Sequence, residues 1–155
     1  MKKWLIYAGA LLMVAFLGMG GRSGADVSDL NPVQLLIADY RNGKVTIATD
    51  TGYLGAGKDV QSALEDMMHS APAKIFVDTA DYLLIRKNAC HLIDQFSKIL
   101  RPSCAVCTLS GMMEPADAAQ FLQYHVPRLT LGKYEAGEKQ LPQLISLEGR
   151  MELVQ

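Results

Sequence analysis

The sequence has little of what marks nucleic-acid binding or the common forms of catalysis. Its 155 residues include 15 Lys and Arg against 16 Asp and Glu, and its basic runs are no longer than the pair Arg86-Lys87. Nucleic acids are bound through clustered positive charge, so this pattern disfavours them as partners. The sequence also has no nucleophile elbow and no histidine pair at metal-binding spacing. We therefore expect a protein that is not an enzyme and that needs no cofactor.

Linkers and repeats are missing too. No internal repeat, low-complexity tract or long Pro/Ser/Gly stretch divides the chain. The residues after the apolar N-terminal segment suffice for one compact domain with its own core and are too few for two. There are only three cysteines, so any disulfide would leave one thiol unpaired. The sequence thus predicts a single folded domain.

The N-terminal segment carries the strongest signal that is present. Two lysines precede an apolar and small-residue run from Trp4 to Gly20, and Ser23 and Ala25 fit the small-x-small rule of signal peptidase. The run also approaches the length of about 20 residues that crosses a bilayer. We expect residues 1–25 to be a signal peptide or a membrane anchor. Residues 26–155 are then an extracytoplasmic domain, secreted or associated with the membrane.

Local patterns predict the first elements of this domain. Val33 to Arg41 and Lys44 to Thr49 have strand character and flank Asn42-Gly43, a pair that accepts the positive φ angles of a type I′ turn. Thr51 to Gly57 is predicted to be a glycine-rich loop. Apolar residues then recur at helical spacing, which predicts a helix from Asp59 to Ser70.

Strands and helices continue to alternate toward the C-terminus. The fold class predicted is α/β (α+β): a single domain with a mixed β-sheet that starts with an antiparallel hairpin and is partly covered by about three helices. An irregular tail follows from Leu129, with strand character returning near its end. The remaining expected elements are strands at 74–78, 82–86 and 104–109, a helix over 89–101, a helix from Pro115 that stops before Pro127, and a last short strand at 150–155.

A glycine-rich segment between a strand and a helix offers a possible phosphate site. Gly52, Gly57 and Lys58 reproduce the glycine and lysine spacing of a P-loop. The next residue is Asp59, where that motif has a Ser or Thr for magnesium, and a carboxylate there repels phosphate. The interpretation we favour is that the glycines turn the chain and Asp59 caps the helix. A small nucleotide- or phosphate-binding enzyme that uses this loop is the alternative.

The cysteines offer a possible metal or redox site. Cys90, His91, Cys104 and Cys107 together have the ligand types of a structural zinc site. Side chains at i and i+3 of a strand point to opposite faces, however, so Cys104 and Cys107 do not readily share one metal. Buried small hydrophobic residues are the expected role. A disulfide from Cys90 to one of the pair, or a zinc or redox protein, remains the weaker alternative.

Four other residues suggest acid/base chemistry. Asp78, Asp81, His91 and His125 are residue types that hydrolases use. No diagnostic spacing connects them, and Asp78 follows a predicted strand, where it is expected to cap a turn. We assign no catalytic residue.

The order of elements resembles a known family. The segments Gly55 to Leu64, Ala71 to Phe76, Tyr82 to Ile85 and Leu100 to Pro102 resemble the N-terminal region of Ger(x)C-type spore germination proteins. The resemblance extends over about Val33 to Leu122. It implies a membrane-associated subunit of a nutrient-germinant receptor on the outer face of the inner spore membrane, without catalytic residues.

Together these observations predict a non-enzymatic, exported or membrane-anchored module of the bacterial envelope, with a role in spore germination or sporulation. Its expected partners are envelope or membrane protein subunits, and the membrane itself through the N-terminal segment. An exposed apolar patch or a free sheet edge is the expected binding surface. The hairpin strands beside Asn42-Gly43 are the predicted edge.

Overall fold

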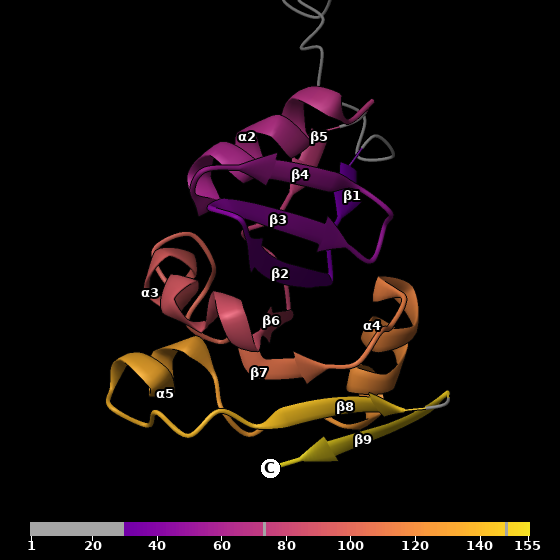
Figure 1. The fold of residues 1–155 in the computed structure, drawn as a ribbon, viewed down its shortest axis with the longest axis vertical. Coiled ribbons are helices and arrows are strands. Elements are labelled where there is room, and N and C mark those ends of the chain that lie inside the picture. The colour runs from indigo at the N-terminus through magenta and orange to yellow at the C-terminus, as the bar shows by residue number, and fades with distance from the viewer. Residues whose placement is uncertain (1–29, 73, 148) are drawn as a thin grey trace, which may run out of the picture.

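A mixed seven-stranded sheet organises the domain. The computed structural model describes residues 30–72, 74–147 and 149–155, and the predicted signal peptide or anchor lies outside them. A small second sheet of two strands accompanies the seven-stranded sheet (Figure 1). None of the helices in the described residues is long and apolar enough to span a membrane. The predicted class, a mixed sheet with helices in a single domain, is confirmed.

The elements are short and closely spaced. In chain order they are β1 (Leu30–Pro32), β2 (Leu35–Arg41), β3 (Lys44–Thr49), β4 (Leu54–Gly57), α2 (Val60–Ser70), β5 (Lys74–Phe76), β6 (Tyr82–Arg86), the 3₁₀ helix η2 (Lys87–Leu92), α3 (Ile93–Phe96), β7 (Ala105–Ser110), α4 (Pro115–Tyr124), α5 (Leu131–Glu135), β8 (Gln143–Leu147) and β9 (Arg150–Val154).

The centre of the large sheet is parallel and its two margins are antiparallel. Its strands follow the order β4-β3-β2-β6-β7-β8-β9, and the small sheet pairs β1 with β5. Strand β2 pairs in parallel with β6, β6 with β7, and β7 with β8. On one side, β3 is antiparallel to β2 and β4 is antiparallel to β3. On the other side, β9 is antiparallel to β8. Parallel strands need crossover connections, which here contain the helices.

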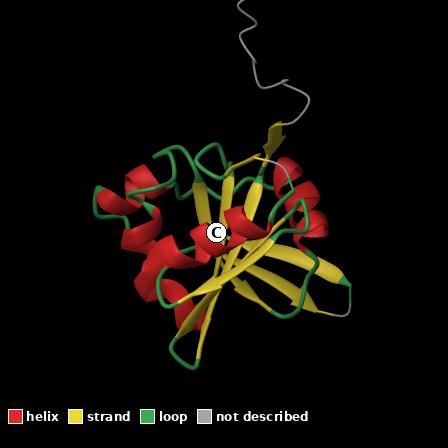
Figure 2. Cartoon of the chain, turned by 90° about the horizontal axis from the view of Figure 1, so that it is seen from above, coloured by secondary structure: helices red, strands yellow, loops and turns green. Residues whose placement is uncertain are grey.

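Helices cover both faces of the sheet, as Figures 1 and 2 show. One core contains buried residues of α2, η2, α3 and α5 together with Leu36, Leu83 and Val106. The core on the other face joins α4 to Leu35, Leu84 and Cys107. Alternate residues of the central strands therefore enter opposite cores. This explains why these strands read as continuous apolar runs rather than as alternating patterns.

The predicted hairpin is confirmed, and its position corrects one expectation. Asn42 and Gly43 have φ angles of 52° and 74°, as the two central residues of a type I′ turn require. The strands that they join, β2 and β3, lie inside the sheet between β6 and β4. The predicted free edge at this hairpin is therefore wrong. The outermost strands are β4 and β9, because β4 adds to β3 on the side away from β2.

The expected glycine-rich loop is partly a strand. Residues Leu54–Gly57 form β4, and α2 lies against it. A Cβ atom on Gly55 would come within 2.1 Å of the carbonyl oxygen of Ala63 and 2.6 Å of the Cβ of Met67. The glycines therefore serve the close approach of a helix to a strand, a role that local sequence does not distinguish from turn formation.

The helix expected over residues 89–101 is broken into shorter pieces. The 3₁₀ helix η2 is followed by the single turn α3. The apolar residues of these two helices that recur at a spacing of three or four are buried: Ala89, Leu92, Ile93 and Phe96. A spacing of three or four residues suits both helix types, which is why the periodicity alone predicted one continuous α-helix.

The tail from Leu129 is more regular than expected. Thr130 caps the short helix α5, and its neighbour Leu131 is buried. Before α5, the chain runs beside the start of β7: the N–H of Val106 donates to the carbonyl oxygen of Leu129 over 2.9 Å. After α5, strand β8 takes over the same edge, and the N–H of Thr108 donates to the oxygen of Pro142 over 2.8 Å. The edge of β7 is thus shared by two segments.

Replacement of Gly55 by alanine tests the contact between β4 and α2. The added Cβ has no space against Ala63 and Met67, so we expect Gly55→Ala to lower the free energy of unfolding by about 3 kcal/mol, as in overpacked cores. Gly43→Ala is the matched control. Its φ of +74° is strained for alanine but a Cβ there meets nothing within 4 Å, so a loss of about 1 kcal/mol is expected. Chemical denaturation of both variants checks this order, and equal losses would contradict it.

Candidate functional site

The predicted phosphate loop is occupied by protein groups. Asp59 is the N-cap of α2: its Oδ1 accepts from the N–H of Ser62 over 2.8 Å and from the Ser62 hydroxyl over 2.7 Å. The N–H of Val60 donates to Oε1 of Gln95 over 3.3 Å. These are amides that a bound phosphate would need. The predicted cap at Asp59 is confirmed.

The other residues of this loop are dispersed. Gly52 lies in the turn before β4 with a φ of 85°, and Lys58 is exposed. Gly57 ends β4, where a Cβ would lie 2.5 Å from the N of Ala63. The hydrogen bonds from Ser62 lower the pKa of the Asp59 carboxyl below its usual 3.8. At neutral pH the helix N-terminus therefore faces a carboxylate of its own chain.

The cysteines lie in separate parts of the structure. Cys104 belongs to the core on one face of the sheet and Cys107 to the core on the other, as their spacing predicts. Cys90 and His91 lie on η2, and all three cysteines are free thiols. Within the described residues, no group of three or more His, Cys, Asp and Glu side chains is placed to hold a metal ion. Burial raises the pKa of both Cys104 and Cys107 to about 12, so these thiols stay protonated at neutral pH.

The four acid/base residue types are likewise not brought together. Asp81 pairs with Arg101. The ring of His91 lies edge-on to Tyr40, with the ring centroids 4.8 Å apart. The ring of His125 stacks on Phe121. These three side chains thus have separate local roles, and Asp78 lines a hollow beside α2.

The carboxyl ends of the central strands carry a polar cluster, formed by Asp39, Arg41, Arg86 and Asn88. Strand β6 continues into η2 on one face of the sheet, whereas β7 continues toward α4 on the other. In parallel sheets, ligands bind in the crevice where successive connections diverge in this way. Here Arg86 spans that position, because its Nη1 donates to the carbonyl oxygen of Gly111 over 2.9 Å.

Asp39 satisfies the donors of this polar cluster. Its Oδ2 lies 2.9 Å from Nε of Arg41 and 3.5 Å from Nε of Arg86, and its Oδ1 accepts from Nδ2 of Asn88 over 2.9 Å. A carboxylate with three donors fixes two arginines in place. The cluster joins β2, β6 and η2, and its charged groups are directed at one another. We interpret it as structural.

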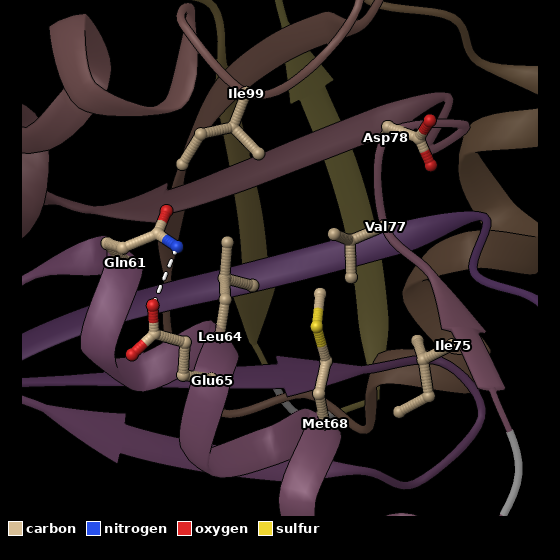
Figure 3. Close-up of a pocket in the computed structure, with 8 residues that line it drawn as sticks. All are labelled: Gln61, Leu64, Glu65, Met68, Ile75, Val77, Asp78 and Ile99. Atoms are coloured by element: carbon tan, nitrogen blue, oxygen red, sulfur yellow. Dashed lines mark hydrogen bonds between the residues drawn. The ribbon is translucent and has the colours of Figure 1, made fainter.

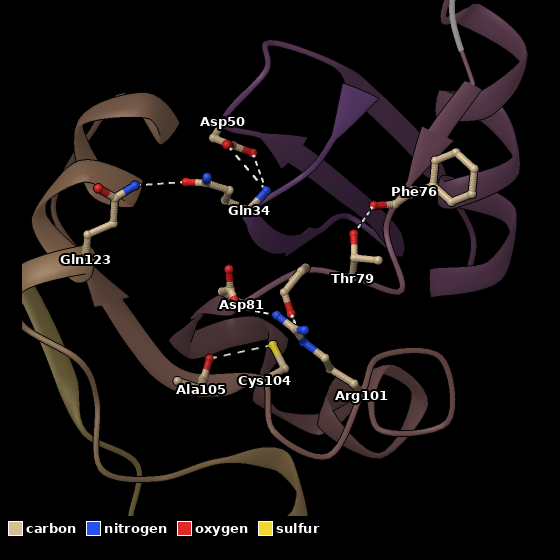
Figure 4. A network of polar contacts seen from close by, with 10 residues as sticks. Gln34, Asp50, Phe76, Thr79, Asp81, Arg101, Cys104, Ala105 and Gln123 are labelled. Carbon is tan, nitrogen blue, oxygen red and sulfur yellow. Dashed lines mark hydrogen bonds and ion pairs between the residues drawn. The ribbon is translucent and has the colours of Figure 1, made fainter. Parts of the chain in front are cut away.

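A second polar network joins the opposite ends of the same strands (Figure 4). Oδ1 of Asp50 accepts from the N–H of Gln34 over 3.2 Å, and the side chain of Gln123 donates to that of Gln34 over 2.9 Å. The N–H of Asp81 donates to the carbonyl oxygen of Gln34 over 2.9 Å, and the N–H of Ala105 donates to the carbonyl oxygen of Asp81 over 2.8 Å. This network ties α4 and three strand ends together and is also structural.

One apolar hollow lies beside α2, as Figure 3 shows. It has a volume of about 270 Å³ and is lined by Leu64, Met68, Ile75 and Val77 among others. Three of these four residues are buried, and Met68 is exposed. The hollow is small and sits over the core beside α2. We regard it as a packing defect of the surface rather than as a binding site.

A larger hollow lies between the end of α4 and strand β9. Its volume is about 520 Å³. We call its lining the α4–β9 surface and define it by Phe121, Tyr124, His125, Val126, Met151 and Leu153. The Tyr124 side chain is 80% exposed and that of Val126 is 55% exposed. Arg128, Glu152 and Gln155 complete the lining, so exposed apolar side chains adjoin polar ones there. Exposed apolar side chains bordered by polar residues mark interaction sites in soluble domains.

Internal contacts hold the α4–β9 surface in shape. The ring of His125 stacks on that of Phe121 with centroids 4.1 Å apart and planes inclined by 8°. At the end of β9, Oε1 of Gln155 accepts from the N–H of Arg128 over 2.9 Å and its Nε2 donates to the oxygen of Val126 over 3.2 Å. The two walls of the hollow are thus connected directly.

The two edges of the sheet differ in protection. At β4, the N–H of Ala56 donates to Oδ2 of Asp66 on α2 over 2.9 Å, so the helix covers that edge. At β9, no described strand pairs with the outer side. An open sheet edge is a template for another strand. The exposed apolar side chains and the open edge therefore meet at the α4–β9 surface.

Comparison with protein-family models, curated proteins and solved structures found no match to this chain. The candidate site therefore depends on the geometry of the chain itself.

Sequence reasoning did not find the α4–β9 surface. Its residues come from two segments about 25 positions apart, and each looks ordinary alone. One signal was available: Tyr124 falls outside the stripe of buried residues Ala118, Ala119 and Leu122 on α4. An aromatic residue off the buried face of a helix is a candidate contact residue.

Removal of the helix cap tests the structural interpretation of the loop. Because the folded-state pKa of Asp59 is lowered, its contribution to stability is present above pH 3.8 and is lost as the pH falls through the folded-state value. We expect Asp59→Ala to lower stability at pH 7 and this difference to shrink in acid. Lys58→Ala is the matched control: the charge of Lys58 is the smallest of the causes that lower the Asp59 pKa, so we expect a much smaller loss. Thermal unfolding from pH 7 to pH 3 measures both, and a loss for Asp59→Ala that does not depend on pH would contradict the assignment.

The thiols provide a second test. Because Cys104 and Cys107 are buried and stay protonated, we expect iodoacetamide at pH 8 to leave both unmodified in the folded protein. Unfolding in guanidinium should make all three cysteines react. Intact mass measured before and after unfolding counts the adducts. Two or more adducts on the folded protein would show that the strand cysteines are accessible.

Proposed function

We propose that this chain is a non-enzymatic assembly module of the bacterial envelope and that it binds a protein partner through the α4–β9 surface. The observation that carries the proposal is the exposure of Tyr124 and Val126 beside a hollow and an open strand. Burial of such apolar side chains is the main driving force of protein association. A partner that fits this surface presents an apolar or aromatic segment.

The location belongs to the same proposal. The positive and apolar pattern of residues 1–25 supports export or anchoring, so the proposed location of the domain is outside the cytoplasm. The partners are then envelope or membrane protein subunits. The resemblance to the N-terminal region of Ger(x)C-type proteins favours a spore germination or sporulation assembly among these.

The phosphate-binding and cysteine-based alternatives receive less support from the geometry. The amides at the start of α2 are bonded to Asp59 and Gln95, and the strand cysteines occupy opposite cores. Neither arrangement favours a second candidate function.

A change at Tyr124 tests the proposed interface. The full chain is purified from detergent-solubilised membranes of sporulating and of vegetative cells, and co-purifying proteins are identified by mass spectrometry. We expect an envelope subunit to be recovered. Tyr124→Asp should reduce its recovery about tenfold or more, since it places a charge where the aromatic ring would be buried against the partner. Lys58→Ala, on an exposed residue away from α4, should leave recovery unchanged. Equal recovery by both variants, or no envelope subunit at all, would refute the proposal.

A further inference from the structure

Strand β9 presents an open edge with a specific charge order. It is the last strand of the sheet, and among the described residues only β8 pairs with it. In an antiparallel pair, only alternate residues direct their N–H and C=O groups at the neighbour. The other residues of β9 therefore present theirs at the open edge.

The charged residues of β9 carry no local ion pair. Arg150 and Glu152 lie two positions apart on one face of the strand, and both are exposed. None of the ion pairs within the described residues includes either of them. Edge strands are commonly protected by charges of one sign, which repel a second copy. One basic and one acidic residue at this spacing do not repel a copy, because an antiparallel neighbour presents them in reverse order.

We propose that β9 pairs with β9 of a second copy, antiparallel and about a two-fold axis that passes through Met151. In this register Met151 lies opposite its counterpart. Arg150 lies opposite Glu152 of the second copy, and the symmetry repeats that pair. Opposite charges directly across an antiparallel pair stabilise it.

The neighbouring register is disfavoured. A shift of the axis to Glu152 allows more strand overlap, but it places Glu152 opposite its own counterpart. Like charges directly opposite destabilise a strand pair. The charge order of β9 therefore selects the axis at Met151.

The pairing joins the two copies into one sheet. Residues directly opposite in a sheet point to the same face, so both α4 helices lie on the same side of the joined sheet. The side chains of Met151 and Leu153 from both copies then form one apolar floor between them. The inference rests on the proposed function in taking the α4–β9 surface as an interface, and it names a second copy as the occupant of its edge.

Cysteine cross-linking of the full chain in its membrane tests the register. Opposite residues in an antiparallel pair have Cα atoms about 4.5–5.5 Å apart, within the range that a disulfide spans. We expect Met151→Cys to give a disulfide-linked dimer under copper phenanthroline on a non-reducing gel. Leu153→Cys should give none, because with the axis at Met151 its counterpart lies several positions further along the strand, beyond the reach of a disulfide. This control leaves the charges of Arg150 and Glu152 in place. The unchanged chain controls for its own three thiols.

The outcomes separate clearly. A dimer for Met151→Cys alone supports the proposal. A dimer for Leu153→Cys in preference, or for neither variant, overturns it.

Exchange of the charges tests the ion pairs. Arg150→Glu alone or Glu152→Arg alone places like charges opposite one another twice, so we expect each to weaken dimerisation about tenfold or more. The double variant Arg150→Glu/Glu152→Arg restores the opposite pairs and should recover the affinity of the unchanged chain. Sedimentation of the detergent-extracted full chain measures all four proteins. A double variant as weak as the single variants overturns the proposal.

The two proposals fail in different ways. Dimerisation through Met151 with no envelope subunit recovered removes the proposed function and keeps the dimer. Recovery of an envelope subunit that depends on Tyr124, by a chain that does not cross-link, removes the dimer alone.

Discussion

Burial of the strands β2, β6 and β7 on both faces is the constraint on which the rest of this structure depends. These strands send alternate side chains into two separate cores, so both faces must be covered. Parallel pairing requires the chain to cross over between strands, and the crossovers supply the covering helices. Helices α2, α3 and α5 lie on one face and α4 on the other. Polar networks at Asp39 and Asp81 then fix the two ends of the strands.

The same constraint makes the two edges of the sheet different. At one edge, Gly55 and Gly57 allow α2 to contact the backbone of β4, and Asp66 accepts an edge N–H from Ala56. At the other edge, α4 lies over the central strands and does not reach across β9. The α4–β9 surface lies at this edge. There, exposed apolar side chains adjoin backbone groups of β9 that pair with no described strand. This difference is the physical basis for the proposal that a partner binds at one margin of the molecule.

Local chemistry could be predicted from the sequence where a residue has one dominant conformational role. Asn42-Gly43 specified a turn, Asp59 a cap, and Pro115 the start of a helix, and each is observed. Strand β4 was not predicted, because the need for Gly55 arises from a helix that is distant until the chain folds. The break between η2 and α3 was not predicted, because a 3₁₀ helix and an α-helix both bury side chains that recur every three or four residues. The α4–β9 surface was beyond prediction because it forms only after β7, β8 and β9 have paired.

The shared edge of β7 has a consequence for local unfolding. The amide of Val106 is bonded to Leu129 and that of Thr108 to Pro142, so two hydrogens close together on one strand depend on different neighbours. Opening of the β8–β9 ribbon exposes the amide of Thr108 to solvent exchange and leaves that of Val106 protected. Hydrogen exchange at these two amides therefore reports separately on the segment before α5 and on β8, although both amides belong to one strand.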